Sequence, residues 1–428
     1  MRIALNSWKI RIKNIDSMWM IERLIHIVML LLFMGAFYHL FKQIGGESIY
    51  GFEDDSIQKD IIIVLGYILS LSFVFSTPKR MLNTLLQLPL IWIVIGLAVL
   101  SSFWSEFPLL TLRSSVALIL TTLYAITLLT RFSFDQVIGL LGWTFWIALA
   151  LSLFLIVFMP DLGKMNYQGQ VVWRGVFNQK NQLGNIAVLA LLFHSVLLSR
   201  SKGISRFVWT SGIVTASIMI ISSRSTTAII LSVVLVFSTV VLLLLRYLHK
   251  DWQFTFPIVV VLTLVGIGSV ATNLDKILLF FGKEISLTGR ILLWNKLLSL
   301  GKDHFWLGYG FNAFWLGWQG PSSQVWWDFP TWLPKSAHNS YLNMWLELGL
   351  VGLLLVILLL FWLFAVSFRL YLRDHKNGIF LLLLTLYIIT LNFVETILLY
   401  QNSLYLILFL YMFGYVSVAC TKPKGITR

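Results

Sequence analysis

The chain has 428 residues, of which 58% are hydrophobic and only 12% are charged. This composition excludes a set of soluble domains, and the 32 Phe, 18 Trp and 14 Tyr exclude a disordered polymer. A single cysteine, Cys420, leaves no possibility of an internal disulfide. We therefore expect an integral membrane protein, and the question raised by the net charge of +14 is which side of the membrane carries it.

Apolar runs recur along the whole chain. A membrane-spanning helix needs roughly 20 mostly apolar residues to cross about 30 Å of hydrocarbon. The predicted runs lie near residues 24–41, 61–76, 86–103, 114–130, 137–159, 182–199, 207–222, 226–245, 256–272, 340–367, 379–396 and 403–419. We therefore predict an all-α polytopic integral membrane protein with about twelve transmembrane helices, in a single transmembrane domain that covers residues 1–428. One pair of helices more or fewer is compatible with the pattern, because only a short turn at 223–225 separates two of the runs.

The distribution of charge predicts the orientation. The basic N-terminal segment is placed in the cytoplasm by the positive-inside rule, and both termini are then cytoplasmic. With this assignment the cytoplasmic segments hold the whole excess of +14, and the outer face is neutral. Nucleic acid is excluded as a partner, because the basic residues are spread over short segments and form no continuous patch. The expected partner of this charge is the lipid bilayer.

One long connection, residues 273–339, is predicted to lie on the outer face. Loops of this length in a compact protein usually carry function. Within it, Thr288 or Ser286 is expected to cap a helix in which Arg290 and Trp294 repeat at helical spacing with Leu297 and Leu298. We predict an amphipathic helix that lies on the outer surface.

The first candidate site is the polar stretch 222–227, which contains Arg224 among serines and threonines at the outer start of a span. Free N–H groups and the positive end of the helix dipole, together with hydroxyls and one guanidinium, suit an anion such as phosphate. The alternative is that Arg224 reaches to lipid headgroups while the hydroxyls cap the helix.

The second candidate is the stretch 173–181, again before an outer helix start. Arg174, Lys180 and Asn181 offer two cations and an amide for a second anion or for a sugar. A solvated polar loop is the alternative interpretation.

The third candidate is the sequence His338-Asn339-Ser340-Tyr341 at the outer start of the span 340–367. A neutral imidazole is favoured beside a positive helix end, and this is the protonation state that a general base requires. A lone histidine is more often a hydrogen-bonded structural residue, and that alternative stays open. Asn339 and Tyr341 would then contact the substrate.

Five tryptophans follow one another closely in the long loop. They are Trp315, Trp318, Trp326, Trp327 and Trp332. Anchoring at the membrane interface is the default interpretation, and stacking on the flat faces of sugars is the functional one.

Clustered carboxylates at Glu53-Asp54-Asp55 could hold Mg²⁺ or Mn²⁺ opposite a diphosphate. Nothing else near them supports a metal, so an acidic solvated loop is the preferred interpretation. We expect neither a metal nor an organic cofactor.

An ordered set of these motifs resembles the O-antigen ligase and Wzy-type polysaccharide polymerase superfamily from about residue 170 to 355. The motifs are Arg174-Gly175 with Asn178 to Asn181, Ser223-Arg224, Thr288-Gly289-Arg290 with Trp294, Gly308-Tyr309-Gly310, and His338-Asn339 followed by Glu347-Leu348-Gly349. Trp294 stands where ligases usually have leucine. The stretch 130–181 is closer to exopolysaccharide polymerases.

The resemblance implies an inverting, metal-independent glycosyltransferase of the GT-C fold in the bacterial inner membrane, with a periplasmic active site. The donor would be a glycan on undecaprenyl diphosphate, and the acceptor another glycan or lipid A-core. Carried onto this chain, Arg224 and Arg290 would bind the diphosphate, and His338 would deprotonate the acceptor hydroxyl. Arg174, Lys180, Asn181, Asn339, Tyr341 and Trp294 would contact substrate. Other assembly proteins, such as a chain-length regulator, are possible partners.

Three functions are compatible with these residues. The first is a polymerase that joins lipid-linked repeat units, and the second is a ligase that transfers the finished glycan to lipid A-core. The third is a flippase or transporter, which should place its ionisable residues on broken helices near the membrane midplane. The candidate residues lie at outer helix ends, which disfavours transport.

Overall fold

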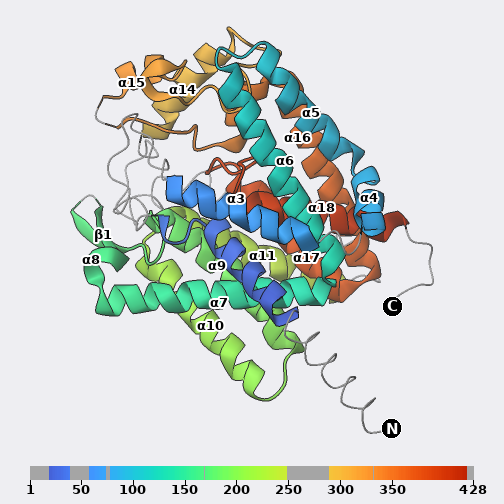
Figure 1. Cartoon of the computed structure of the whole chain (residues 1–428). Coiled ribbons are helices and arrows are strands. Elements are labelled where there is room, and N and C mark those ends of the chain that lie inside the picture. Colours follow the sequence, from blue (N-terminus) through green and yellow to red (C-terminus); the bar gives the residue numbers. More distant parts are fainter. Residues whose placement is uncertain are drawn as a thin grey trace, which may run out of the picture. The chain divides into compact units, whose positions relative to one another are not determined.

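A computed structural model of the chain describes residues 19–38, 57–73, 78–167, 169–247, 289–330 and 332–421. The predicted span at 256–272, the carboxylates at 53–55, Ser286 and Thr288 lie outside these residues. Within them the structure is almost entirely helical, as Figure 1 shows. All predicted runs that fall within the described residues coincide with a helix.

Residues 19–33 form a helix, and further helices follow it as far as Gly163. These are α3 (Ile57–Ser72), α4 (Pro78–Leu86), α5 (Pro89–Leu100), η2 (Ser101–Phe103), α6 (Pro108–Arg131), α7 (Phe134–Phe158) and α8 (Pro160–Gly163). The rest comprises α9 (Lys180–Arg200), α10 (Ile204–Ser222), α11 (Thr226–Tyr247), α14 (Arg290–Gly301), η5 (Gly317–Gln319), α15 (Ser323–Asp328), α16 (Ser340–Arg373), α17 (His375–Leu391) and α18 (Leu404–Thr421).

Among the described helices, six are long and apolar enough to cross a membrane, or up to seven if a bent pair counts as one span. The bent pair joins α4 to α5 and η2 at an angle of 80°, where Pro89 cannot continue the preceding helix. Three shorter apolar helices coincide with other predicted runs. The multi-pass membrane protein is therefore confirmed, whereas the number of twelve spans stays a prediction.

A short β-hairpin is an exception to the all-α prediction. Strand β1 (Lys164–Tyr167) pairs antiparallel with β2 (Gln170–Trp173), and Lys164 lies opposite Trp173. Gly169 in the connecting turn has φ +75°, a backbone conformation that glycine adopts without steric cost. The alternation over four residues was too short to stand out in the sequence.

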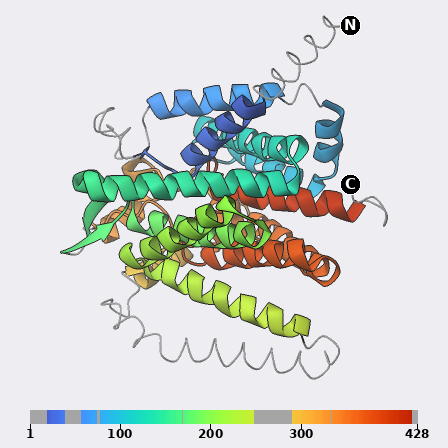
Figure 2. The ribbon, with the colours of Figure 1, turned by 90° about the horizontal axis from the view of Figure 1, so that it is seen from below.

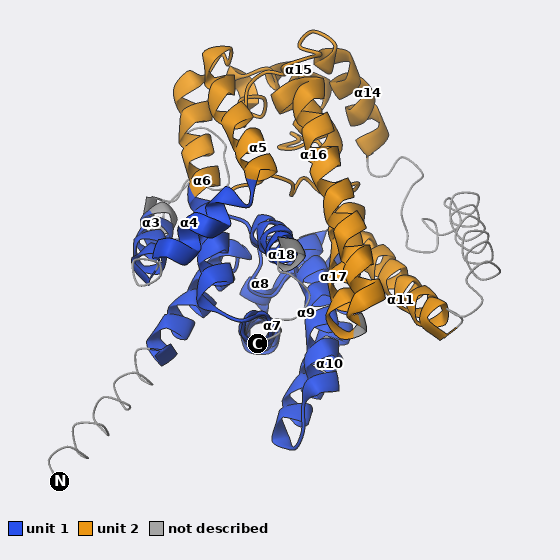
Figure 3. Ribbon diagram, turned by 90° about the vertical axis from the view of Figure 1, so that its right-hand side faces the viewer, with its two compact units in different colours: residues 1–88, 120–225, 402–428 blue, residues 89–119, 226–401 orange. Residues whose placement is uncertain are grey.

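The chain divides into two compact units, which Figure 3 colours separately. Unit 1 comprises residues 1–88, 120–225 and 402–428, and unit 2 comprises residues 89–119 and 226–401. In unit 1, α9 packs against both α7 and α10 (Figure 2). The contact is close, because a Cβ atom on Gly212 of α10 would lie 2.4 Å from Nδ1 of His194 on α9.

In unit 2, α16 packs against α17, α14 and α5. This long helix is broken at Gly349, which has φ 66° and ψ −169°. The segment 305–310 fills the break with backbone hydrogen bonds. The N–H groups of Tyr309 and Gly310 donate to the carbonyls of Leu346 and Glu347 (2.8 and 2.9 Å), and those of Leu350 and Val351 donate to Phe305 and Trp306 (2.9 and 3.3 Å).

Two glycines allow the backbone of the segment 305–310 to lie against the backbone of α16 at its break. A Cβ atom on Gly349 would lie 2.2 Å from the carbonyl of Trp306, and one on Gly308 would lie 2.5 Å from the carbonyl carbon of Glu347. Both also have positive φ values. The Gly308-Tyr309-Gly310 and Glu347-Leu348-Gly349 motifs therefore have a common structural explanation, which is the contact between two backbones.

The long loop has a hydrophobic core of its own. Its members are Leu293, Leu297, Leu300, Tyr309, Phe314, Val325 and Ala337, together with Leu346 of α16. Trp294, Trp315 and Trp332 pack against this core, and Trp326 is buried. Trp318 and Trp327 are 52% and 74% exposed, so their rings are accessible for membrane anchoring or for stacking on sugars.

Candidate functional site

The predicted site residues fall into two groups, one in each unit. Unit 1 holds Arg224, Lys180, Asn181 and Arg174, and we call the first three, with Ser225, the Arg224 cluster. Unit 2 holds His338, Arg290, Asn339, Tyr341 and Trp294, and we call the first two, with Glu395, the His338 cluster.

Arg224 lies in the turn between α10 and α11. It is exposed, and its guanidinium donates a hydrogen bond to Oε1 of Gln170 on β2. Its φ of 49° places a non-glycine residue in the left-handed region, which costs of order 1–3 kcal/mol and is common at binding and active sites. The neighbouring Ser223 and Ser225 are fully buried, so the turn presents the guanidinium and withdraws its hydroxyls.

Lys180 and Asn181 come to this turn from the start of α9. The Lys180 ammonium donates to the carbonyl of Arg224 (3.3 Å) and lies 4.0 Å from the centre of the Tyr167 ring. Oδ1 of Asn181 accepts from the hydroxyl of Ser225 (3.1 Å). The structure thus joins two stretches that the sequence presents as separate anion contacts, and the result is one cluster with two cations.

Arg174 has a different environment. Its Nε donates to the carbonyl of Leu162 (2.9 Å) and its Nη2 to that of Asp161 (3.4 Å), so the guanidinium satisfies carbonyls of the short helix α8. The backbone beside it is close-packed, because a Cβ atom on Gly175 would lie 2.4 Å from Ser152. These contacts give Arg174 a structural role, and its contact with substrate stays a prediction.

His338 directly precedes the N-cap of α16. Oδ1 of the N-cap residue, Asn339, accepts from the N–H groups of Tyr341 and Leu342 (3.0 and 3.1 Å), and His338 itself has a positive φ of 47°. Its ring stacks on Trp332, with centroids 5.9 Å apart and planes inclined by 20°. Two of the three predicted catalytic residues, Arg224 and His338, are therefore among the few described non-glycine residues with positive φ.

Glu395 faces His338 from the loop after α17. Its Oε2 lies 3.7 Å from Nδ1 of His338, and the two side chains are 19% and 27% exposed. This separation is too long for a hydrogen bond, but catalytic hydrogen bonds in ligand-free structures often shorten only when substrate binds.

Ser340 fixes this loop to the start of α16. Its hydroxyl donates to the carbonyl of Glu395 (2.8 Å) and accepts from the N–H of Ile397 (2.9 Å), while its own N–H donates to Asn392 (2.8 Å). The backbone on which Glu395 is carried is therefore held in place beside His338.

Arg290 is the first residue of α14, and its Nη1 donates to the carbonyl of Val394 (2.8 Å). One turn later, Nε1 of Trp294 donates to the carbonyl of Ala337 (2.8 Å). The helix thus contacts the residues that directly precede Glu395 and His338. Its N-cap is Gly289, whose φ of 84° is a left-handed conformation that glycine permits, and the predicted caps Thr288 and Ser286 lie outside the described residues.

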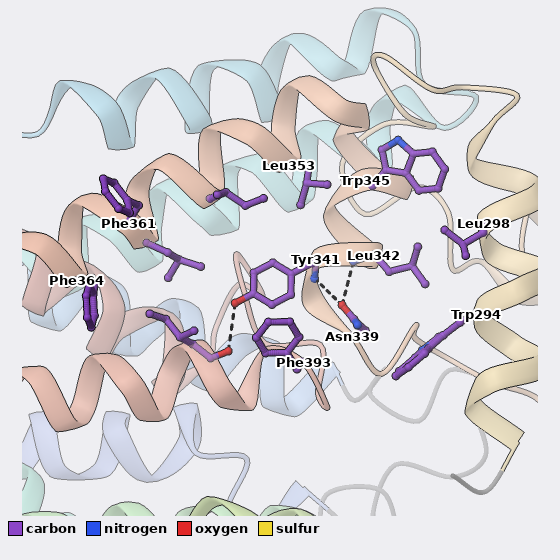
Figure 4. Close-up of a pocket in the computed structure, with 13 residues that line it drawn as sticks. Trp294, Leu298, Asn339, Tyr341, Leu342, Trp345, Leu353, Phe361, Phe364 and Phe393 are labelled. Carbon is purple, nitrogen blue, oxygen red and sulfur yellow. Dashed lines mark hydrogen bonds between the residues drawn. The ribbon is translucent and has the colours of Figure 1, made fainter. Parts of the chain in front are cut away.

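An elongated apolar groove of about 700 Å³ opens beside this cluster (Figure 4). Trp294 and Leu298 of α14 line one end, and Phe361 and Phe364 of α16 line the other. Asn339, which follows His338, and Phe393, which precedes the Val394 carbonyl bound by Arg290, lie along the same groove. His338 and Arg290 do not line the groove themselves, but each adjoins residues that do.

Tyr309, in the Gly308-Tyr309-Gly310 motif, is structural. Burial, with smaller contributions from Asp303 and Glu106, raises the pKa of Tyr309 to about 12. The hydroxyl therefore stays protonated and donates to the carbonyl of Leu300 (3.0 Å).

Two residues in contact at these sites, Glu395 of the His338 cluster and Gln170, which binds Arg224, were not predicted from the sequence. A signal for Glu395 was present, because it is the only acidic residue that follows Asp374. An acidic residue at the end of an apolar span is rarely incidental. Gln170 carries no such signal, since its contact with Arg224 depends on the hairpin.

Among the described residues, no group of three or more His, Cys, Asp or Glu side chains could hold a metal ion. The carboxylates at 53–55, which are the sequence's own candidate for a metal, are not among those residues.

Two comparisons with known proteins bear on the site. A family model described as O-antigen ligase matches residues 211–357, a range that contains Arg224, Arg290 and His338. The exopolysaccharide production protein ExoQ of Rhizobium meliloti (strain 1021) is 26% identical over 287 residues, which is 61% of each chain. The chain thus spans about 61% of the length of that relative. Together the two findings support the resemblance of this multi-pass membrane protein to the O-antigen ligase and Wzy-type superfamily, and in particular to an exopolysaccharide production protein.

Proposed function

We propose that this chain is a membrane glycosyltransferase that polymerises oligosaccharide repeat units carried on undecaprenyl diphosphate. The observation that carries the proposal is that Arg290 and His338 adjoin an apolar groove: Arg290 binds the carbonyl of Val394, next to Phe393 in the lining, and His338 precedes Asn339 in the lining. A cation, a candidate base and an apolar groove are what an enzyme needs to hold a lipid-linked diphosphate and to activate a hydroxyl beside it. Similarity to an exopolysaccharide production protein supports the polymerase.

The reaction assigns a task to each side chain. Nε2 of His338 takes the proton from the acceptor hydroxyl while the hydroxyl oxygen attacks the anomeric carbon of the donor glycan. The bond from that carbon to the diphosphate oxygen breaks, its electron pair leaves with the diphosphate, and the anomeric configuration inverts. Arginine stabilises the departing charge, since its planar fork matches phosphate oxygens in two parallel hydrogen bonds.

Glu395 completes the arrangement as a positioning residue. With its carboxylate beside Nδ1 of His338, the tautomer that carries its proton on Nδ1 is favoured and Nε2 is left free to accept one. After proton transfer the same carboxylate stabilises the imidazolium.

The Arg224 cluster serves as the second anion contact of the proposal. Its two cations, Arg224 and Lys180, can share the charge of a diphosphate, and they do so without a metal ion. Such a site raises affinity for the donor throughout the reaction, whereas the His338 cluster acts on the step in which the bond breaks.

A ligase is the second candidate, because the matching family model is described as O-antigen ligase. Ligase and polymerase share the chemistry above and differ in the acceptor, which is lipid A-core for the ligase. Trp294, in the position where ligases usually have leucine, favours the polymerase.

Transport is the third candidate, and α16 does contain a break with the buried Glu347 beside it. The backbone groups that such a break exposes could coordinate an ion. Here the N–H groups of Tyr309 and Gly310 occupy the freed carbonyls of Leu346 and Glu347. This occupancy favours the enzyme over the transporter.

The proposal places both clusters on the periplasmic face of the inner membrane and both termini in the cytoplasm. The test is purified protein supplied with a repeat unit on undecaprenyl diphosphate, with and without lipid A-core, in EDTA. A ladder of polymer without lipid A-core supports the polymerase, and product only with lipid A-core identifies a ligase. Loss of activity in EDTA with rescue by Mg²⁺ would move the assignment to Asp54 and Asp55.

A further inference from the structure

The β-hairpin of unit 1 has two different faces, because successive side chains of a strand point to opposite sides of a sheet. The register pairs Tyr167 with Gln170, and Val172 of β2 lies on the same face. Val172 is 1% exposed, and β2 packs against α9 and α10. Asn166 and Val171 are paired on the opposite face, and both are exposed. The first face therefore lies against the protein, and the second is directed away from it.

The inner face ends at the two cations of the Arg224 cluster. Oε1 of Gln170 accepts a hydrogen bond from the guanidinium of Arg224. The ring of Tyr167 lies 4.0 Å from the ammonium of Lys180, which is 7% exposed. Tyr167 and Gln170 are the last pair of the register before the turn, and we call them the hairpin tip. Each residue of the tip thus contacts one of the cations.

The base of the hairpin is fixed to the short helix α8 (Figure 1). The N–H groups of Arg174 and Gly175 both donate to the carbonyl of Gly163 (3.0 and 2.9 Å), and the Arg174 side chain binds two further carbonyls of α8. The side chains of the tip nevertheless stay accessible, since Gln170 is exposed and Tyr167 is partly exposed. The hairpin therefore holds two accessible polar side chains at a defined position beside the cations.

The contact between Gln170 and Arg224 contributes little to the stability of the fold. Both side chains are exposed, so their hydrogen bond replaces bonds to water. A side-chain amide has two N–H donors in addition to its oxygen, and a phenol hydroxyl can both donate and accept. Gln170 uses its oxygen on Arg224, and its amide donors and the Tyr167 hydroxyl can bind a molecule held at the cations.

Resting on the function proposed above, we propose that the hairpin tip binds the first sugar of the donor. This sugar is bonded directly to the diphosphate, so side chains that contact the diphosphate-binding cations lie next to it. The amide of Gln170 and the hydroxyl of Tyr167 hydrogen-bond its hydroxyl groups, and the Tyr167 ring offers apolar surface to its C–H groups. Loss of either side chain leaves no buried group unpaired, so we expect a moderate change in Kd, about 3- to 10-fold.

Equilibrium binding to the purified protein in nanodiscs tests this contact with two probes. One is undecaprenyl diphosphate without sugar, and the other is the lipid-linked glycan of the same bacterium, trimmed with glycosidases to its first sugar. Gln170→Ala should raise the Kd of the sugar-bearing lipid about 3- to 10-fold and leave that of the sugar-free lipid unchanged. Tyr167→Phe, which keeps the ring beside Lys180, should change the two Kd values in the same way. Asn166→Ala and Val171→Ala, on the opposite face of the same hairpin, should bind both lipids as the wild type does.

The two probes separate failure of the hairpin tip from failure of the proposed function. Equal loss of both lipids in Gln170→Ala would overturn the proposal, since the residue would then act only by positioning Arg224. Wild-type affinity of both tip variants for the sugar-bearing lipid would overturn it as well. A wild type that binds sugar-free undecaprenyl diphosphate no better than undecaprenol would instead refute the proposed diphosphate site, and the contact with the first sugar together with it.

Discussion

The Arg224 cluster and the His338 cluster share a backbone feature but differ in their charged groups. Each centres on a non-glycine residue in a left-handed turn, with φ near 49° in one and 47° in the other. The Arg224 cluster presents an exposed guanidinium, supported by a second cation, Lys180. The His338 cluster sets an imidazole against a carboxylate, next in sequence to residues that line an apolar groove. The first arrangement suits the binding of charge, and the second suits the transfer of a proton.

The comparison depends first on topology, for which an all-or-none result is expected. In a Cys420→Ala background, Asn166→Cys in the hairpin and Gln324→Cys in α15 should react with an impermeant maleimide on intact spheroplasts. Lys202→Cys should react only after lysis, because the positive-inside rule places it in the cytoplasm. All three side chains are exposed in the structure. Ser322, two residues before Gln324, is fully buried and is therefore unsuitable for labelling. Labelling of only one of Asn166→Cys and Gln324→Cys would place the two clusters on opposite sides of the membrane, and the comparison between them would no longer hold.

The largest graded effect is expected for His338→Ala. If His338 is the general base, the rate should fall on the order of 10²- to 10⁴-fold, because positioned proton transfer contributes that much. His304→Ala is the matched control, since His304 lies exposed in the same loop, with its ring 4.2 Å from that of Tyr309 and tilted by 44° to it. Turnover should be measured at equal amounts of membrane-inserted protein. Near-normal turnover of His338→Ala would refute the assignment of the base.

The two arginines should respond differently to the same change. Lysine keeps the charge but loses the fork, so Arg290→Lys and Arg224→Lys should each cost roughly 10- to 100-fold in kcat/KM. We expect the loss in Arg290→Lys to be mainly in kcat and that in Arg224→Lys mainly in KM for the donor.

Arg206→Lys is the control for both arginine variants, because Arg206 is exposed near the other end of α10 and should tolerate the change. A loss in kcat for Arg224→Lys would show that the Arg224 cluster also acts on the transition state.

The smallest effect is expected for Glu395→Gln. An amide keeps the shape but weakens the interaction with His338, and one hydrogen bond of about 0.5–1.5 kcal/mol corresponds to roughly a 2- to 10-fold loss of rate. Asp328→Asn is the control, since Asp328 pairs with Lys296 in the same unit (2.7 Å).

A double variant distinguishes positioning from a general structural role. Because Glu395 is proposed to act through His338, Glu395→Gln should have no further effect on the residual rate of His338→Ala. Additive losses would show that the carboxylate works independently of the histidine.

Particular residues show how much of the structure can be predicted from local sequence. The apolar runs were predicted well because a span is recognised from about twenty consecutive residues. His338 and Arg290 stood out because each polar residue began a helix. The hairpin and Glu395 were missed for the opposite reason, since their significance lies in contacts with Arg224 and His338 that are 54 and 57 positions away in the sequence.

The sequence by itself predicted a multi-pass membrane protein that resembles the O-antigen ligase and Wzy-type superfamily, and it identified the charged residues at the helix ends as candidate site residues. The tertiary structure alone decided which of them meet, how the segment 305–310 crosses the break at Gly349, and where the groove runs. The physical reason is that hydrophobicity and charge are properties of neighbouring residues. A buried backbone crossing or a groove depends on groups that only folding brings together.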